Sequence, residues 1–106
     1  MKKAILFLLC TFFFLQNCST PSQLKTYGRH YQKHRDSYSL QKVIELFELG
    51  ADTADVKIVL GEGIDMGFDY RYLLDSVGEN GCAVGAVFHI NDLGKIDQKW
   101  LGEICE

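Results

Sequence analysis

The cysteine and histidine side chains of this 106-residue chain could supply a nucleophile, a base or metal ligands. Cys82 and His89 stand seven residues apart in a predicted strand. This odd separation places the two side chains on opposite faces of a strand, and a rise of about 3.3 Å per residue separates them by roughly 23 Å. A cysteine nucleophile activated by this histidine is therefore not expected.

His30 and His34 lie four residues apart in the segment HYQKH, a spacing at which two histidines on a helix can bind one metal ion. The segment lacks the glutamate of the HExxH zinc motif, and Lys33 and Arg35 would repel a cation. We expect exposed histidines in a tether and predict no metal site.

Residues 61–67, GEGIDMG, invite comparison with nucleotide-binding loops but lack the GxGxxG spacing. A strand-like pattern follows them, where a phosphate-binding loop would lead into a helix. Asp65, Asp69 and Asp75 form no recognisable catalytic pair and are typical of solvated charge. We therefore predict no catalytic residue, cofactor or small-molecule substrate. An accessory enzyme that uses Asp65 or Asp69 in this loop is the less favoured alternative.

The N-terminal segment has the pattern of an export signal. Lys2 and Lys3 precede an apolar stretch at residues 4–15. A membrane-spanning helix needs about 20 apolar residues, so this stretch is too short to span and is typical of a secretory signal. Residues 1–17 are accordingly predicted to be a signal peptide.

The residues Leu15, Gln16, Asn17 and Cys18 resemble the lipobox of bacterial lipoproteins, with leucine three positions before the cysteine. Gln16 and Asn17 depart from the small residues most common there. The resemblance implies that Cys18 becomes the N-terminus and carries covalent lipid, which anchors the protein without spanning the membrane. The alternative is a conventional signal followed by an ordinary cysteine.

Two cysteines remain once the signal and the anchor are set aside. The chain has four cysteines; Cys10 leaves with the signal and Cys18 carries the lipid. The remaining pair, Cys82 and Cys105, predicts one disulfide in an oxidising compartment. Two free thiols are the alternative.

Charge divides the chain after the signal. Residues 19–38 contain four Lys or Arg and one Asp, for a net charge of 4 − 1 = +3, whereas residues 39–106 contain five basic and thirteen acidic residues, 5 − 13 = −8. We predict that residues 18–38 are a lipidated cysteine with a flexible basic tether, and that residues 39–106 form a small domain. The tether either lies against anionic headgroups or is a solvated linker. The acidic domain argues against nucleic acid as a partner.

Two short helices are predicted at the start of the domain. The first has an apolar stripe at Leu40, Val43, Ile44 and Phe47, with Ser39 as its N-cap and Gly50 as its end. The second is predicted to start at Asp52 or Thr53 and to end at Gly61, with Asp55 in its first turn and Val56, Val59 and Leu60 on one face. A strand at residues 56–60 is the competing interpretation.

Three strands are predicted to follow. Residues 68–75 alternate in the period of a strand with one buried face, and residues 82–105 predict a hairpin whose turn has Asn91 first and Gly94 fourth. The side chains predicted to face the core in the first of these strands are Phe68, Tyr70, Tyr72 and Leu74. The fold class is therefore α+β, with two short helices packed on a three-stranded antiparallel sheet.

The turn also predicts the register of the hairpin. It pairs Ile90 with Ile96 and Ala86 with Trp100, so that Val84, Phe88, Ile90, Ile96 and Trp100 share the buried face. His89 then meets Asp97 on the other face. In this register Cys82 and Cys105 are diagonal and on opposite faces, so their bonding requires a bend after Gly102.

Residues 39–101 resemble the SmpA/OmlA (BamE-like) family of envelope lipoproteins. The matching positions are Gly50, Thr53, Val56, Leu60, Gly61, Tyr70, Tyr72, Phe88, Gly94 and Lys95. The resemblance implies two helices before a sheet and a non-catalytic module that contacts outer-membrane or other envelope proteins, as in β-barrel assembly. The same arrangement is similar to β-lactamase-inhibitor-type domains.

We therefore predict a lipid-anchored protein-binding module of the cell envelope, at the periplasmic face or outer surface of the outer membrane, with a role in outer-membrane assembly or stabilisation. The predicted partner surface is the exposed side of the sheet, at Arg71, His89, Asp97 and Lys99. A surface-exposed lipoprotein or an inhibitor-type domain that binds an external protein is the alternative.

Overall fold

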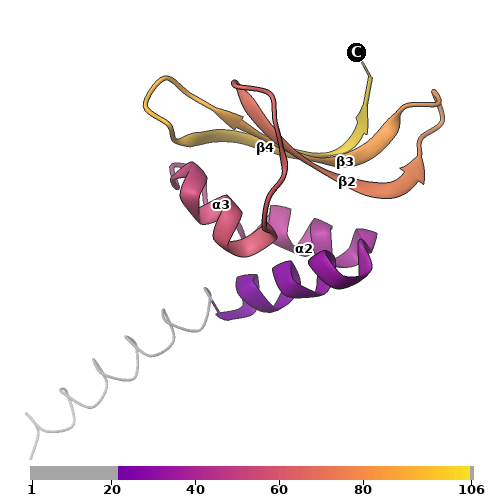
Figure 1. Ribbon diagram of the computed structural model, residues 1–106, viewed down its shortest axis with the longest axis horizontal. Helices are drawn as coiled ribbons and strands as arrows, with labels where there is room; N and C mark the ends of the chain where they lie inside the picture. The colour runs from indigo at the N-terminus through magenta and orange to yellow at the C-terminus, as the bar shows by residue number, and fades with distance from the viewer. Residues whose placement is uncertain (1–21, 106) are drawn as a thin grey trace, which may run out of the picture.

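The computed structural model describes residues 22–105, which form an α+β unit of three helices and one four-stranded antiparallel sheet. The helices lie together on one face of the sheet, and the other face is left uncovered by them (Figure 1). Over residues 22–105, no helix combines the length and apolar character needed to cross a membrane. The predicted signal peptide and Cys18 lie outside the described residues.

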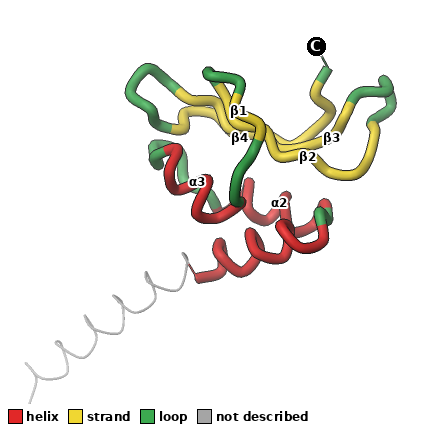
Figure 2. Tube along the Cα trace, in the orientation of Figure 1, coloured by secondary structure: helices red, strands yellow, loops and turns green. Residues whose placement is uncertain are grey.

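Residues 22–34 are helical, so the flexible tether predicted over residues 18–38 is wrong for this part (Figure 2). Leu24, Tyr27, Gly28 and Tyr31 recur at the spacing of one helix face and turn toward the rest of the fold. Tyr31 is only 2% exposed, and its hydroxyl donates to the carbonyl of Leu73 at 2.5 Å. The folded unit therefore includes this helix.

Gly28 lets the first helix approach α3 (Thr53–Leu60) closely. A Cβ at this position would lie 2.1 Å from the carbonyl oxygen of Val59, so no larger residue fits without movement. Beside this contact, Gln32 Nε2 donates to the same oxygen at 3.0 Å. The two residues together fix the first helix against the end of α3.

Helix α2 spans Ser37–Leu46 and is capped by Asp36. The Asp36 carboxylate accepts from the backbone N–H of Ser39 at 2.9 Å. The predicted N-cap at Ser39 is therefore wrong: Ser39 is already inside the helix and buried. Leu40, Val43 and Phe47 are buried as predicted, but α2 ends before Gly50, with Phe47 as its C-cap.

Helix α3 spans Thr53–Leu60 and agrees with its sequence signals. Asp52 is the N-cap and its backbone N–H donates to the Asp55 carboxylate at 3.3 Å, while Gly61 ends the helix at a φ of 79°. The buried residues are Val56, Val59 and Leu60. The competing interpretation, a strand at residues 56–60, is excluded.

The sheet has the order β1-β2-β3-β4. Its strands are β1 Ile64–Asp65, β2 Asp69–Val77, β3 Ala83–Ile90 and β4 Ile96–Ile104. The prediction of three strands missed β1, because two residues are too short to show an alternating pattern. Tyr70, Tyr72 and Leu74 of β2 are buried as predicted, whereas Phe68 precedes the strand and is 55% exposed.

The β3–β4 hairpin has the predicted turn but a different register. Gly94 has a φ of 75° and its N–H donates to the carbonyl of Asn91 at 3.0 Å. Ile90 pairs with Ile96 as predicted, but a bulge follows, and Asp97 has no partner in the ladder. Beyond the bulge every pair is displaced by one residue.

The displacement explains two differences from the prediction. Trp100 pairs with Val87 instead of Ala86 and so lies on the face away from the helices. In this part of the hairpin the numbers of two paired residues always have the same sum, 187, as for Ala83 and Ile104. The numbers of Cys82 and Cys105 have this sum as well. Cys82 and Cys105 are therefore directly opposite each other and need no bend. They form a disulfide with a Cα–Cα distance of 5.3 Å.

Candidate functional site

The open face is the side of the sheet that the helices do not cover (Figure 1). Four residues align across it in register, one from each strand: Ile64, Arg71, Val87 and Trp100. Ile64 is 46% exposed and Trp100 42% exposed, at the two edges of this row. Val87 lies between Arg71 and Trp100 and is only 4% exposed. The row thus presents apolar and aromatic surface with one guanidinium inside it.

Further apolar side chains are exposed at one end of the sheet. Met66 and Phe68 lie in the β1–β2 connection and Leu93 in the β3–β4 turn. The backbone N–H of Ile90 donates to the carbonyl of Phe68 at 2.9 Å, which joins the two connections side by side. This end of the sheet therefore exposes further apolar surface in addition to the open-face row.

Charged residues on the open face are held by one another. Arg71 Nε donates to the buried Asp69 carboxylate at 3.1 Å. His89 Nδ1 lies 2.6 Å from Asp97 Oδ1, as the hairpin pattern predicted. Asp69 and His89 are also paired across β2 and β3. The structure thus brings three of the four predicted partner-binding residues, Arg71, His89 and Asp97, to this face.

Lys99 does not belong to the open face. It pairs with the fully buried Phe88 on the helix side of the sheet. Its Nζ donates to the carbonyl of Phe47 and, at 3.5 Å, to that of Glu45, at the end of α2. The bulge at Asp97 is the reason, because it reverses the faces of the residues that follow. Lys99 therefore satisfies helix C-terminal carbonyls instead of forming part of the predicted surface.

Trp100 and Ile64 lie on the open face although the sequence pattern does not predict them there. Trp100 was placed in the core by a register without the bulge, and Ile64 was assigned to a loop. The unpaired Asp97 still contacts His89, and it moves Trp100 to the open face. From the sequence, this arrangement could be found only by comparing the pairs of the hairpin with and without the bulge. Gly102 lies beside the indole of Trp100: a Cβ added at Gly102 would be 3.7 Å from the ring, an ordinary contact distance.

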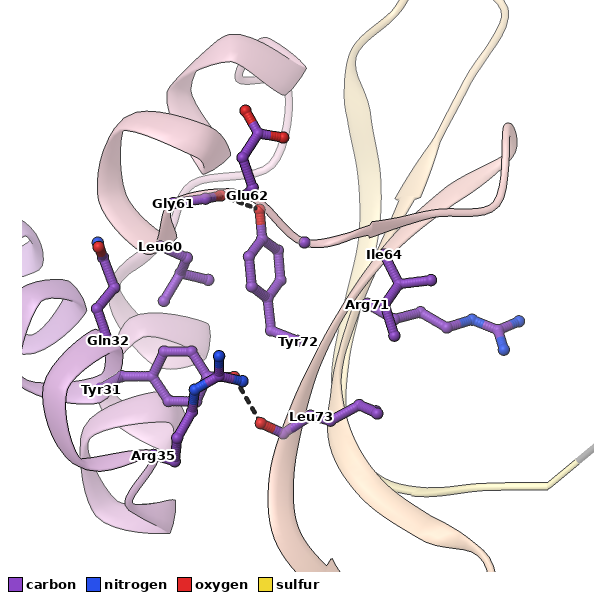
Figure 3. Close-up of a pocket in the computed structure, with 11 residues that line it drawn as sticks. Tyr31, Gln32, Arg35, Leu60, Gly61, Glu62, Ile64, Arg71, Tyr72 and Leu73 are labelled. Atoms are coloured by element: carbon purple, nitrogen blue, oxygen red, sulfur yellow. Dashed lines mark hydrogen bonds between the residues drawn. The ribbon is translucent and has the colours of Figure 1, made fainter.

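A groove of about 360 Å³ lies at the edge of the sheet, between the first helix, the end of α3 and β2 (Figure 3). Its phenols are already engaged: Tyr31 donates to Leu73, and Tyr72 donates to the carbonyl of Gly61 at 2.9 Å. Burial raises the pKa of both tyrosines, so both remain neutral donors. Arg71 points away from Tyr31, toward the open face (Figure 3).

The carboxylates that the enzyme alternative requires are used elsewhere. Asp65 accepts from the backbone N–H of Gly67 at 2.8 Å within its own turn. Asp69 is paired with Arg71. Neither lines the groove, where Glu62 contributes the carboxylate. The arrangement therefore gives the accessory-enzyme alternative no support.

His30, Asp36 and Ser39 have the composition of a catalytic triad without its geometry. Asp36 Oδ1 and Ser39 Oγ both lie 2.8 Å from His30 Nδ1, whereas a triad uses different ring nitrogens for the acid and the nucleophile. Burial alone would raise the pKa of Asp36, but hydrogen bonds from Ser39 and His30 outweigh it and lower the pKa to about 2. The cluster therefore joins the first helix to the cap of α2.

The two histidines of HYQKH come together because their segment is helical. The rings of His30 and His34 have centroids 4.4 Å apart on the outer side of the first helix. Within residues 22–105, the grouping of three potential metal ligands is Cys82, Glu103 and Cys105. Both of its thiols are in the disulfide and cannot act as thiolate ligands.

Comparisons with known proteins bring no further information to these residues. No protein-family profile matches the chain, and neither the curated proteins nor the solved structures include a match. The resemblance to the SmpA/OmlA (BamE-like) lipoproteins therefore stays a prediction that rests on the residues named for it.

Proposed function

We propose that this protein is a lipid-anchored, non-catalytic module of the cell envelope that binds another protein through its open face. The observation that carries the proposal is the row formed by Ile64, Arg71, Val87 and Trp100 across all four strands. Tryptophan and arginine are enriched among the residues that contribute most to protein interfaces. Here both stand on one regular surface.

The position of these groups in the sheet favours recognition without rearrangement. Arg71 is fixed by Asp69 at 3.1 Å, and its neighbour Val87 is already desolvated. A binding group that is held before the partner arrives loses little conformational entropy on binding. Trp100, still 42% exposed, is the aromatic side chain of this row and has apolar surface left to bury in an interface.

The membrane part of the proposal depends on Cys18. Acyl chains on this residue would hold the module at a membrane, since each buried methylene contributes about 0.8 kcal/mol. The family resemblance supports the outer membrane, and a role in assembling or stabilising its proteins, as the place and purpose of the binding. Mass spectrometry of the mature N-terminus tests the anchor, and an unmodified Cys18 would refute it.

Site-specific photo-crosslinking in native membranes tests the binding surface. A photoreactive residue in place of Trp100 should capture a defined envelope protein. Ile58, which is exposed on α3, provides the matched control position and should capture none. Crosslinks from position 58 but not from position 100 would assign binding to the helix side and overturn the proposal.

A further inference from the structure

We infer that the outer face of the first helix is a docking surface for anionic phospholipid headgroups. The surface consists of Lys25, Arg29 and Lys33, and we call it the basic helix face. These residues follow one another at intervals of four along residues 22–34, so they form one stripe on the helix. All three are exposed.

The basic helix face carries charge that the fold leaves unneutralised. Residues 22–35 contain four Lys or Arg and no Asp or Glu, for a net charge of +4, whereas residues 36–105 contain five basic and thirteen acidic residues, 5 − 13 = −8. Among the described residues, the ion pairs involve none of Lys25, Arg29 and Lys33. A domain that is strongly acidic overall thus has a segment of net positive charge at residues 22–35.

The surface is also hollowed where a headgroup could lie. A shallow groove of about 320 Å³ is lined by Thr26, Arg29, His30, Lys33 and His34. Among these lining residues are two permanent cations, Arg29 and Lys33, and no carboxylate. The Thr26 hydroxyl donates to the carbonyl of Ser22, and His30 Nδ1 is held by Asp36. Phosphate oxygens bind best to charged donors such as those of Arg29 and Lys33.

The opposite face of the same helix is occupied, which fixes the orientation. Tyr31 is buried, and Gly28 is packed against Val59. The helix therefore cannot turn its charges toward the rest of the fold. In Figure 1 the first helix lies on the side of the molecule away from the sheet, so a membrane on the basic helix face leaves the open face accessible to a protein.

The distance to the proposed anchor selects a membrane over other anionic partners. This step rests on the proposed function. Cys18 precedes residue 22 by four positions, and an extended chain spans at most about 3.6 Å per residue, so residue 22 lies within roughly 14 Å of a lipidated cysteine. Each Lys or Arg close to an anionic membrane strengthens binding by roughly fivefold.

Amine labelling of the full-length protein, purified with its native N-terminus, tests the inference. The protein is mixed with vesicles of phosphatidylcholine alone, or of phosphatidylcholine and phosphatidylglycerol in equal parts. We expect the labelling rates of Lys25 and Lys33 to fall by roughly fivefold on the anionic vesicles and to recover in high salt. Lys95, in the β3–β4 connection, should label equally on both.

A pair of charge reversals makes the test specific to this surface. Arg29→Glu should weaken the protection of Lys25 and Lys33, whereas Lys57→Glu, an equal charge change on α3, should leave it intact. Equal labelling on both kinds of vesicle, or equal loss of protection in the two variants, would overturn the inference. Protection in native membranes but not on anionic vesicles would overturn it in favour of an acidic protein.

The mass of the N-terminal peptide from the same preparation separates this inference from the proposed function. If Cys18 is lipidated and the basic helix face is not protected, the inference fails and the anchor stands. If Cys18 is unmodified, the anchor fails, and the comparison of the two kinds of vesicle still decides whether the face binds anionic headgroups.

Discussion

Trp100 pairs with Val87 across the β3–β4 hairpin, and this pairing places the indole on the open face of the sheet. Val87 is buried between Trp100 and Arg71 in the row, so Trp100 is the outer member of a formed surface. The binding properties of the module can therefore be tested at one side chain that the core does not need.

Trp100→Ala should weaken binding of the crosslinked partner by about 2 kcal/mol or more, roughly 30-fold, because an interface tryptophan contributes on this scale. Affinity measured with the purified partner checks the prediction. Ile58→Ala, which removes another exposed apolar side chain, should leave affinity unchanged. Equal losses in both variants would show a general effect of surface hydrophobicity and not a site.

Gly28→Ala should lower the free energy of unfolding by about 1–3 kcal/mol, the usual cost of overpacking a tight contact. The added Cβ would lie 2.1 Å from the carbonyl oxygen of Val59. The sign of the change is the test, because alanine would stabilise an unpacked helix by about 1 kcal/mol relative to glycine. Urea unfolding followed by circular dichroism measures it, with Thr26→Ala on the exposed side as control.

Lys99→Met should lower stability by about 1 kcal/mol and leave partner binding unchanged. Its ammonium donates to the carbonyls of Phe47 and Glu45, and a lost hydrogen bond has a cost of this size. Lys33→Met, an exposed lysine without an ion pair in the described structure, should not change stability. Weakened binding in folded Lys99→Met protein would return Lys99 to the partner surface.

Replacing Cys82 and Cys105 together by alanine should lower the free energy of unfolding by about 3 kcal/mol, because the disulfide closes a loop with a sequence separation of 23. Reduction of the unchanged protein should produce a shift of the same size in chemical denaturation. A double variant as stable as the oxidised protein would show that the hairpin does not depend on the bond.

Acid should destabilise the protein partly through Asp36. Its pKa is about 2 in the folded protein against an ordinary 3.8, so the folded state prefers the carboxylate. The stabilisation is complete above about pH 4 and is lost as the pH falls from there toward 2. In unfolding measurements across this range, Asp36→Asn should show a shallower loss of stability than the unchanged protein. Asp92→Asn, in the β3–β4 turn, should retain the full acid dependence.

Local signals in the sequence were sufficient for some elements. The acidic first turn and the glycine end of α3 act through neighbouring backbone groups, so Asp55 and Gly61 could be assigned without knowledge of the fold. The same holds for Gly94, whose left-handed conformation belongs to the turn itself. The buried side of β2 was also visible, because Tyr70 and Tyr72 alternate with polar residues.

Other elements depend on contacts between distant residues. The stripe of Leu24, Tyr27, Gly28 and Tyr31 was overlooked because one of its members is a glycine and two are tyrosines, which weakens the apolar pattern. The reason for the glycine in this stripe is its close contact with Val59, which is distant in the sequence. The bulge at Asp97 also depends on contacts between distant residues. One unpaired residue leaves the apolar pattern of each strand unchanged and shifts only the register in which the two strands pair.

Strand β4 lies at the edge of the sheet and is tied at both ends. Near its start, Ile96 exchanges backbone hydrogen bonds with Gly50 and Ala51 at 2.6 and 2.8 Å. Beyond its end, Cys105 is joined to Cys82. A strand fastened in this way cannot peel off and exchange with the same strand of a neighbouring copy, which is how domain-swapped dimers arise. While the disulfide is intact, Trp100 is therefore presented by a strand that stays in its own molecule.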